Sequence, residues 1–115
     1  MKYNIHNLIG AYCVTPQRGQ EVYDIIHPLL TEGKAVELDF LGVKAYASPF
    51  FNYAIGQLLK DIPDADVNRL VKFSNLSSNG TSVLQMVMNS AKRYYTEDSY
   101  RQAVHEVREE ELAAY

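Results

Sequence analysis

The side chains of this sequence that could take part in catalysis include one cysteine and three histidines: Cys13, His6, His27 and His105. The histidines fall on three different expected elements, and their spacing does not supply the three or four ligands of a metal site. Cys13 could be reactive near a helix N-terminus, but the role of a small buried hydrophobic residue is favoured. Phosphate-binding loops, nucleophile elbows and zinc-protease motifs are missing. We therefore expect no metal ion, no organic cofactor and no enzymatic activity.

A second group of residues is suited to binding a partner: Asp39, Gly42, Ser48, Phe50, Phe51 and Asn52. Asp39 closes a short apolar strand, and Gly42 permits a tight turn after it. Ser48 precedes Pro49, a pattern typical of a helix start with a hydroxyl cap. A phosphoryl group on Ser48 would lie in the field of that helix start and add nearly two negative charges. On spacing alone, a plain cap with two phenylalanines anchoring the helix is the favoured interpretation.

The elements that must position these residues alternate between helix and strand. Thr15-Pro16 predicts the start of a helix that runs to Thr31, with Pro28 expected to kink or end it and Gly33 to stop it. The run Ala35–Phe40 alternates apolar and acidic residues and predicts a central buried strand. A second helix is expected from Pro49 to about Ile62.

The remaining segments continue the alternation. We expect strands at Tyr3–Ile9 and Val67–Phe73, a helix from about Asn79 to Tyr95 and a last helix from Ser99 to about Ala113. Helices that connect strands in this order predict an α/β fold with a largely parallel sheet.

Length and composition limit the classes of protein to be considered. The 115 residues suit a single domain spanning residues 1–115. With 14 Asp and Glu against 11 Lys and Arg, the chain does not have the basic excess of nucleic-acid binders. No apolar run approaches the roughly 20 residues of a membrane-spanning helix. One cysteine excludes an intramolecular disulfide, so we expect a cytoplasmic protein without membrane contact.

The central stretch resembles a known family. The segment AVELDFLGVKAYASPFFNYAIGQLLKD is similar to the central motif of small bacterial STAS-like domains of unknown function, and VNRLVKFSNLSSNGTSVLQMVMNSAKRYY looks like the next strand, turn and helix of that family. The resemblance covers roughly Thr15 to Tyr95. It implies a small mixed β-sheet with helices packed largely on one face, to which residues 97–115 add a C-terminal helix.

More distantly, the chain resembles the anti-sigma-factor antagonists of bacterial partner switching. These bind a kinase-like ATPase of the GHKL type, which phosphorylates a serine at the loop-to-helix junction and so breaks the complex. Antagonists commonly carry Asp-Ser-Ser-Gly at this junction. Here the corresponding residues are Ala47, Ser48, Pro49 and Phe50, so a proline occupies the position that is usually phosphorylated.

The resemblance implies a regulatory protein-interaction module that binds a protein partner, an ATPase or kinase, around Ser48. Self-association through residues 97–115 is a further expectation, with packing of that helix on its own sheet as the equal alternative. Two other functions stay open: a small enzyme using Ser48, Asp39 and a histidine, and a component of a phage–host conflict system, acting in defence or as an inhibitor.

Overall fold

The computed structural model describes residues 1–96 of the chain, and within them two small sheets carry the fold. A three-stranded sheet has the order β1-β3-β5, and a two-stranded sheet pairs β2 with β4. Every pairing is parallel, so the α/β class is confirmed, and the sheets are parallel rather than mixed. The strands are β1 (Lys2–Asn4), β2 (Tyr12–Cys13), β3 (Val36–Asp39), β4 (Ala45–Tyr46) and β5 (Val71–Ser74).

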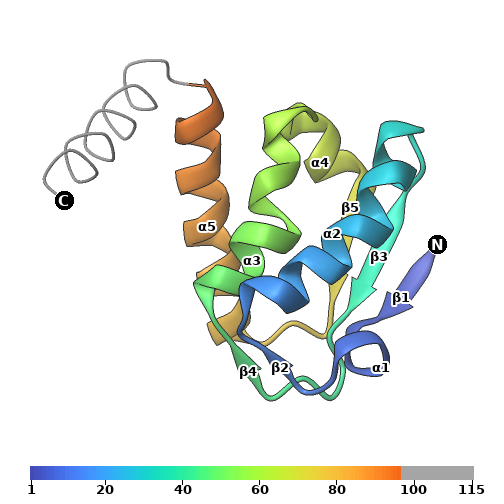
Figure 1. The fold of residues 1–115 in the computed structure, drawn as a ribbon, viewed down its shortest axis with the longest axis vertical. Helices are drawn as coiled ribbons and strands as arrows, with labels where there is room; N and C mark the ends of the chain where they lie inside the picture. Colours follow the sequence, from blue (N-terminus) through green and yellow to red (C-terminus); the bar gives the residue numbers. More distant parts are fainter. Residues whose placement is uncertain (97–115) are drawn as a thin grey trace, which may run out of the picture.

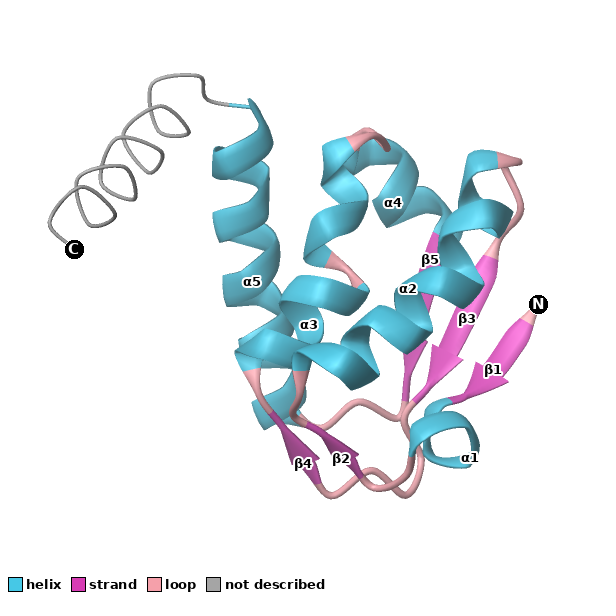
Figure 2. Cartoon of the chain, viewed as in Figure 1, coloured by secondary structure: helices cyan, strands magenta, loops and turns pink. Residues whose placement is uncertain are grey.

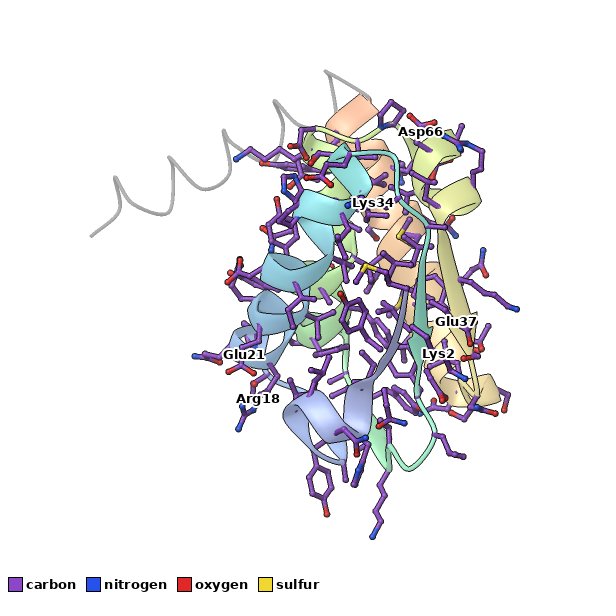
Figure 3. All side chains as sticks on the ribbon, turned by 90° about the vertical axis from the view of Figure 1, so that its right-hand side faces the viewer. Lys2, Arg18, Glu21, Lys34, Glu37 and Asp66 are labelled. Atoms are coloured by element: carbon purple, nitrogen blue, oxygen red, sulfur yellow. The ribbon has the colours of Figure 1, made fainter. Side chains whose placement is uncertain are left out.

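The helices lie largely on one face of the three-stranded sheet (Figures 1 and 2). They are α1 (Ile5–Ile9), α2 (Pro16–Thr31), α3 (Ser48–Ala54), the 3-10 helix η1 (Gly56–Lys60), α4 (Asp64–Leu70) and α5 (Ser78–Thr96). In Figure 3, Lys2 and Glu37 point from the sheet to the side away from α2. The expected helix from Ser99 to Ala113 lies outside the described residues.

Helix α2 follows from local sequence signals. The Thr15 hydroxyl oxygen accepts a hydrogen bond from the backbone N–H of Arg18 at 3.3 Å. Pro16 fills the first helical position, as expected from its fixed φ. Pro28 does not end the helix, which continues to Thr31. Gly33 follows with φ of 79°, a conformation that glycine adopts without strain, so the expected stop is confirmed.

Two expected strands are in fact divided between strand and helix. After β1, the side chain of Asn4 accepts a hydrogen bond from the N–H of Asn7 at 2.9 Å and so caps α1. The segment expected as a strand at Val67–Phe73 is helical as far as Leu70. Asp64 and Asp66 lie in the first turn of α4, where acidic side chains stabilise a helix.

The long helix expected from Pro49 to Ile62 is also broken. It ends at Ala54 and is followed by η1, which begins at Gly56. A Cβ atom at Gly56 would lie 3.3 Å from Cγ1 of Val87 in α5. The glycine thus permits close packing of η1 on α5, while weakening the continuous helix.

The core lies between the sheet and its helices. An aromatic cluster joins the sheets to α3, with neighbouring ring centroids between 5.2 Å and 6.4 Å apart. These separations are typical of favourable aromatic pairs. The cluster consists of Phe40, Tyr46, Phe50, Phe51 and Phe73.

Cys13, at the end of β2, is fully buried. Burial raises the pKa of its thiol to about 12, because the charged thiolate is disfavoured away from water. The prediction of a small buried residue at this position is confirmed.

None of the helices in residues 1–96 is both long enough and apolar enough to cross a membrane.

Candidate functional site

The Ser48 junction lies at the end of the two-stranded sheet. The backbone N–H of Ala47 donates to the carbonyl oxygen of Cys13 at 2.9 Å, which extends the β2–β4 pairing to the residue before α3. Ala47 is the N-cap of α3, and no side chain caps this helix. The prediction that Ser48 is the cap is therefore wrong, because Ser48 already lies within the helix and forms its first turn with Pro49.

The two phenylalanines of the junction face inward. Phe50 is 1% exposed and Phe51 is fully buried, and their rings meet edge to face at 5.2 Å. Phe51 also stacks on Tyr46, with ring centroids 6.0 Å apart. The prediction that both rings belong to a partner-facing surface is corrected: a fully buried ring cannot contact a partner, and these two anchor α3 to the core.

The exposed side of α3 carries a different set of residues. Pro49 and Asn52 are exposed, Tyr53 is 46% exposed, and Ser48 is half-buried. Positions 49, 52 and 53 are spaced by three and four residues, so they share one face of the helix. We call Ser48, Pro49, Asn52 and Tyr53 the α3 surface.

Helix α2 supports the α3 surface from behind. A Cβ atom at Gly19 would overlap the carbonyl oxygen of Phe50 and lie 2.9 Å from Cβ of Tyr53. Only glycine therefore allows the two helices to approach this closely. One turn further along the chain, the amide of Gln57 donates to Gln20 of α2 at 2.9 Å. The first turn of α3 is thus held between a packed core and a packed helix.

Asp39 belongs to a separate polar cluster, at the carboxyl ends of the three-stranded sheet. Its Oδ1 accepts hydrogen bonds from the backbone N–H of Leu41 at 3.0 Å and from the side-chain amide of Asn75 at 2.8 Å. Lys2 lies 3.8 Å from Oδ2 of Asp39. Asn75 has φ of 54°. Asparagine tolerates this left-handed conformation better than most residues. These contacts tie the end of β3 to the turn after β5, and we call them the Asp39 clamp.

Glu37 extends this cluster along the face of the sheet that points away from α2 (Figure 3). The Ser74 hydroxyl donates to Oε2 of Glu37 at 2.8 Å, and Lys2 lies 3.8 Å from the same oxygen. Sequence reasoning missed Lys2, Ser74 and Asn75. A signal for Ser74 and Asn75 was available, because polar residues at the carboxyl ends of neighbouring parallel strands meet at one edge of the sheet. Every buried polar side-chain atom in the described part of the chain has a partner, which indicates a structural role for the Asp39 clamp.

Gly42 has φ of 90°, as expected for a tight turn, and it lies against the ring of His6. Residues 40–47 separate Asp39 from Ser48, and they include β4 of the second sheet. The predicted site residues therefore divide between two places. Asp39 and Gly42 lie at the end of the three-stranded sheet, and Ser48 and Asn52 lie on α3.

The Asp39 clamp predicts a pH dependence of stability. The hydrogen bonds from Asn75 and Leu41, together with the charge of Lys2, hold the pKa of Asp39 below its ordinary value of 3.8. A carboxylate with a depressed pKa stabilises the fold fully at a pH above its unfolded pKa and loses this contribution as the pH falls through its folded pKa. Asp39→Asn should therefore be less stable than wild type at pH 7, with the difference shrinking below about pH 4.

Urea unfolding of both proteins at pH 7, 5 and 3 measures this effect. The other carboxylates titrate in both proteins, so their contributions cancel in the comparison. A stability difference that stays constant from pH 7 to pH 3 would show that Asp39 is not held as a carboxylate.

Neither His6 nor His27 contacts Ser48 within residues 1–96, and His105 lies outside the described residues. Nε2 of His27 lies 2.8 Å from Oδ2 of Asp61, and its ring stacks on Tyr23 at 4.8 Å. His6 lies against Gly42. Across residues 1–96, no three His, Cys, Asp or Glu side chains form a group that could hold a metal ion.

Comparison with known proteins assigns this chain to a family. The profile of the STAS-like domains of unknown function matches residues 18–81, from the first turn of α2 to the first turn of α5. No curated protein and no solved structure gave a match. The matched region includes β3, Asp39 and Asn75 of the clamp, and the whole α3 surface. Since the match covers more than half of the 115 residues, the chain belongs to the family of STAS-like domains of unknown function.

Proposed function

We propose that this STAS-like domain is a non-enzymatic regulatory module that binds a protein partner through the α3 surface. The observation that carries the proposal is the arrangement of helix α3. Two buried phenylalanines fix the helix from inside, while Asn52 and Tyr53 are exposed on its outer side. The resemblance to anti-sigma-factor antagonists adds the class of partner, an ATPase of the GHKL type.

The fixed position of this helix favours binding. A surface that is already ordered loses little conformational freedom when a partner docks, so more of the contact energy appears as affinity. Tyrosine is enriched at the energetic centres of protein interfaces, because its ring offers a large contact area and its hydroxyl a hydrogen bond. Asn52 and the half-buried Ser48 supply polar contacts around it.

In our proposal Ser48 contributes to this surface as a contact residue, and its phosphorylation is the second candidate role. Pro49 occupies the position that antagonists usually phosphorylate. Helix α3 has only seven residues, so only a short helix N-terminus is available to an anion such as a phosphoryl group on Ser48. A negative charge at Ser48 would nevertheless oppose docking of an apolar or acidic partner surface.

The proposal of a module without enzymatic activity is supported by the surroundings of the candidate general bases. A serine nucleophile needs a base within hydrogen-bond reach. Within the described residues, His27 contacts Asp61 and Tyr23, and His6 lies against Gly42, so neither histidine contacts Ser48. Asp39, the other candidate for the group, is held by Asn75 and Leu41.

Tyr53→Ala is expected to weaken partner binding at least about tenfold, as loss of an interface hot spot does. The wild-type protein and the variant are used as baits in cells of the source organism, and captured proteins are identified by mass spectrometry. The affinity of the purified partner is then measured by isothermal titration calorimetry. Ser48→Ala and Ser48→Asp separate the loss of a hydroxyl contact from the effect of added charge.

Lys72→Ala is the matched control, because Lys72 is exposed on β5 and lies on the sheet rather than on α3. It should bind as wild type does. Equal affinities for wild type, Tyr53→Ala and both Ser48 variants would mean that α3 is not the binding surface. Circular dichroism of each bait establishes that it is folded.

A further inference from the structure

A groove runs between β5 and α5, on elements other than those of the α3 surface. It encloses about 540 Å³. This volume is within the range of ligand-binding clefts. Residues of α4 and the turn after β5 contribute to one wall, and α5 forms the other. The residues that line it include Val67, Phe73, Leu76, Leu84, Gln85 and Met88.

One side of this groove is the outer edge of the three-stranded sheet. The order β1-β3-β5 places β5 at the border of the three-stranded sheet, and no strand within residues 1–96 pairs with its outer side. The carbonyl oxygen of Ser74 faces β3, where it accepts from the N–H of Phe40 at 2.9 Å. Backbone groups of successive strand residues point to opposite sides, so the N–H and C=O of Phe73 point outward. Such an edge is a template for another extended chain.

Helix α5 limits what can bind at this edge. Leu84, Gln85 and Met88 of α5 line the groove together with Phe73 and Leu76. A single strand could lie between these walls, but α5 stands where the further strands of a second sheet would have to pass. The shape therefore favours one extended segment over edge-to-edge pairing with a second copy of this domain.

The chemical character of the lining residues also indicates which kind of segment can bind in the groove. The charged residues that line the groove, Asp64 and Lys92, are 3.5 Å apart and form an ion pair between α4 and α5. The other polar lining residues are amides and a hydroxyl, and the half-buried apolar side chains of Leu76 and Met88 lie among them. An uncharged segment with alternating polar and apolar side chains complements such a surface. Residues 97–115 of the chain itself carry six acidic residues against two arginines, and so complement it poorly.

We propose that the β5–α5 groove binds an extended, uncharged peptide segment of a partner protein, which adds as a strand to the edge of β5. Its backbone pairs with Phe73, and its alternate apolar side chains enter the groove toward Leu84 and Met88. This interaction uses a surface separate from the α3 surface and does not depend on the function proposed above.

Peptides from a random display library of about seven residues, within the usual length of a strand, provide the probe. Selection on the immobilised full chain should enrich uncharged sequences with apolar residues at every second position. A synthetic peptide of the selected sequence, labelled with a fluorophore, then reports the Kd by fluorescence polarisation. Its binding should slow hydrogen exchange of the Phe73 amide.

Two variants of exposed α5 residues form a matched pair. Gln85→Trp fills the groove and should weaken peptide binding at least about tenfold. Ser82→Trp adds the same ring outside the groove lining and should change the Kd by less than about twofold. Tyr53→Ala, on the α3 surface, should leave peptide binding unchanged, so that this proposal and the proposed function succeed or fail separately.

Three results would overturn the proposal. The first is equal binding by wild type and Gln85→Trp, and the second is a selection that enriches no alternating apolar pattern. The third result concerns the full chain without peptide: slow hydrogen exchange of the Phe73 amide that becomes fast in Gln85→Trp. Residues of the chain itself would then occupy the groove.

Discussion

Phe51→Ala is expected to lower the free energy of unfolding by about 3–5 kcal/mol, the usual cost of removing a buried aromatic ring. Phe51 is fully buried and lies among Phe40, Tyr46 and Phe50, with ring centroids between 5.2 Å and 6.1 Å away. Its removal takes away apolar contacts and leaves a cavity that neighbouring rings can fill only in part. A domain of this size has a stability of about 5–15 kcal/mol, so the variant should be folded but markedly weakened. Urea unfolding followed by circular dichroism measures the difference.

Tyr53→Ala is the control on the same helix. Its ring is half-exposed, and alanine keeps the Cβ atom that packs on Gly19. Its free energy of unfolding should therefore change by less than about 0.5 kcal/mol, as for other surface substitutions. Similar losses in the two variants would contradict the assignment of Phe51 to the core and Tyr53 to the surface. If Phe51→Ala does not fold, Phe51→Leu should show a smaller loss in the same direction.

Leu38→Ala is expected to cost about 2–5 kcal/mol of unfolding free energy. Leu38 is fully buried in β3, the central strand, with Tyr3 of β1 and Phe73 of β5 as its register partners. Burial of its side chain contributes about 2 kcal/mol, and the cavity adds to the loss. Chemical denaturation monitored by far-UV circular dichroism gives the value.

Leu38→Val should lie between wild type and Leu38→Ala, since it removes one methylene group rather than three carbons. Lys72 is exposed on the neighbouring strand. Lys72→Ala should therefore change the free energy of unfolding by less than about 0.5 kcal/mol. A loss below about 1 kcal/mol in Leu38→Ala would be incompatible with a strand buried at the centre of the sheet.

Elements with strong local signals could be predicted from the sequence. Thr15 and Pro16 start α2, Gly33 follows its end, and the alternation in Ala35–Phe40 predicts β3. The signals that failed were short or ambiguous. A two-residue strand such as β4 has no periodicity to detect, and its structure depends on pairing with β2, a distant part of the sequence. Position-to-position alternation cannot distinguish a single helical turn from the end of a strand, as at Ile5–Ile9.

For the candidate site, too, the sequence predicts the elements better than it predicts the directions of their side chains. The sequence predicts where α3 begins, but not which side of its first turn faces the core. Spacing alone favours Phe50 and Phe51 as anchors of the helix, and their packing in the aromatic cluster agrees with this. The resemblance implied a partner site around Ser48 and so led to the wrong expectation that both rings face a partner. Asn75 was missed because its contact with Asp39 spans 36 positions of sequence and depends on the sheet order.

Site-specific photo-crosslinking tests the central claim, that the α3 surface binds a protein partner, most directly. A benzophenone amino acid is placed at position 53 in one protein and, in another, at position 34, an exposed residue after the end of α2 and on neither proposed binding surface. Both proteins are irradiated in cells of the source organism. We expect a crosslinked partner from position 53, identified by mass spectrometry as a GHKL-type ATPase, and none from position 34. A partner crosslinked from position 34 but not from position 53 would contradict the claim.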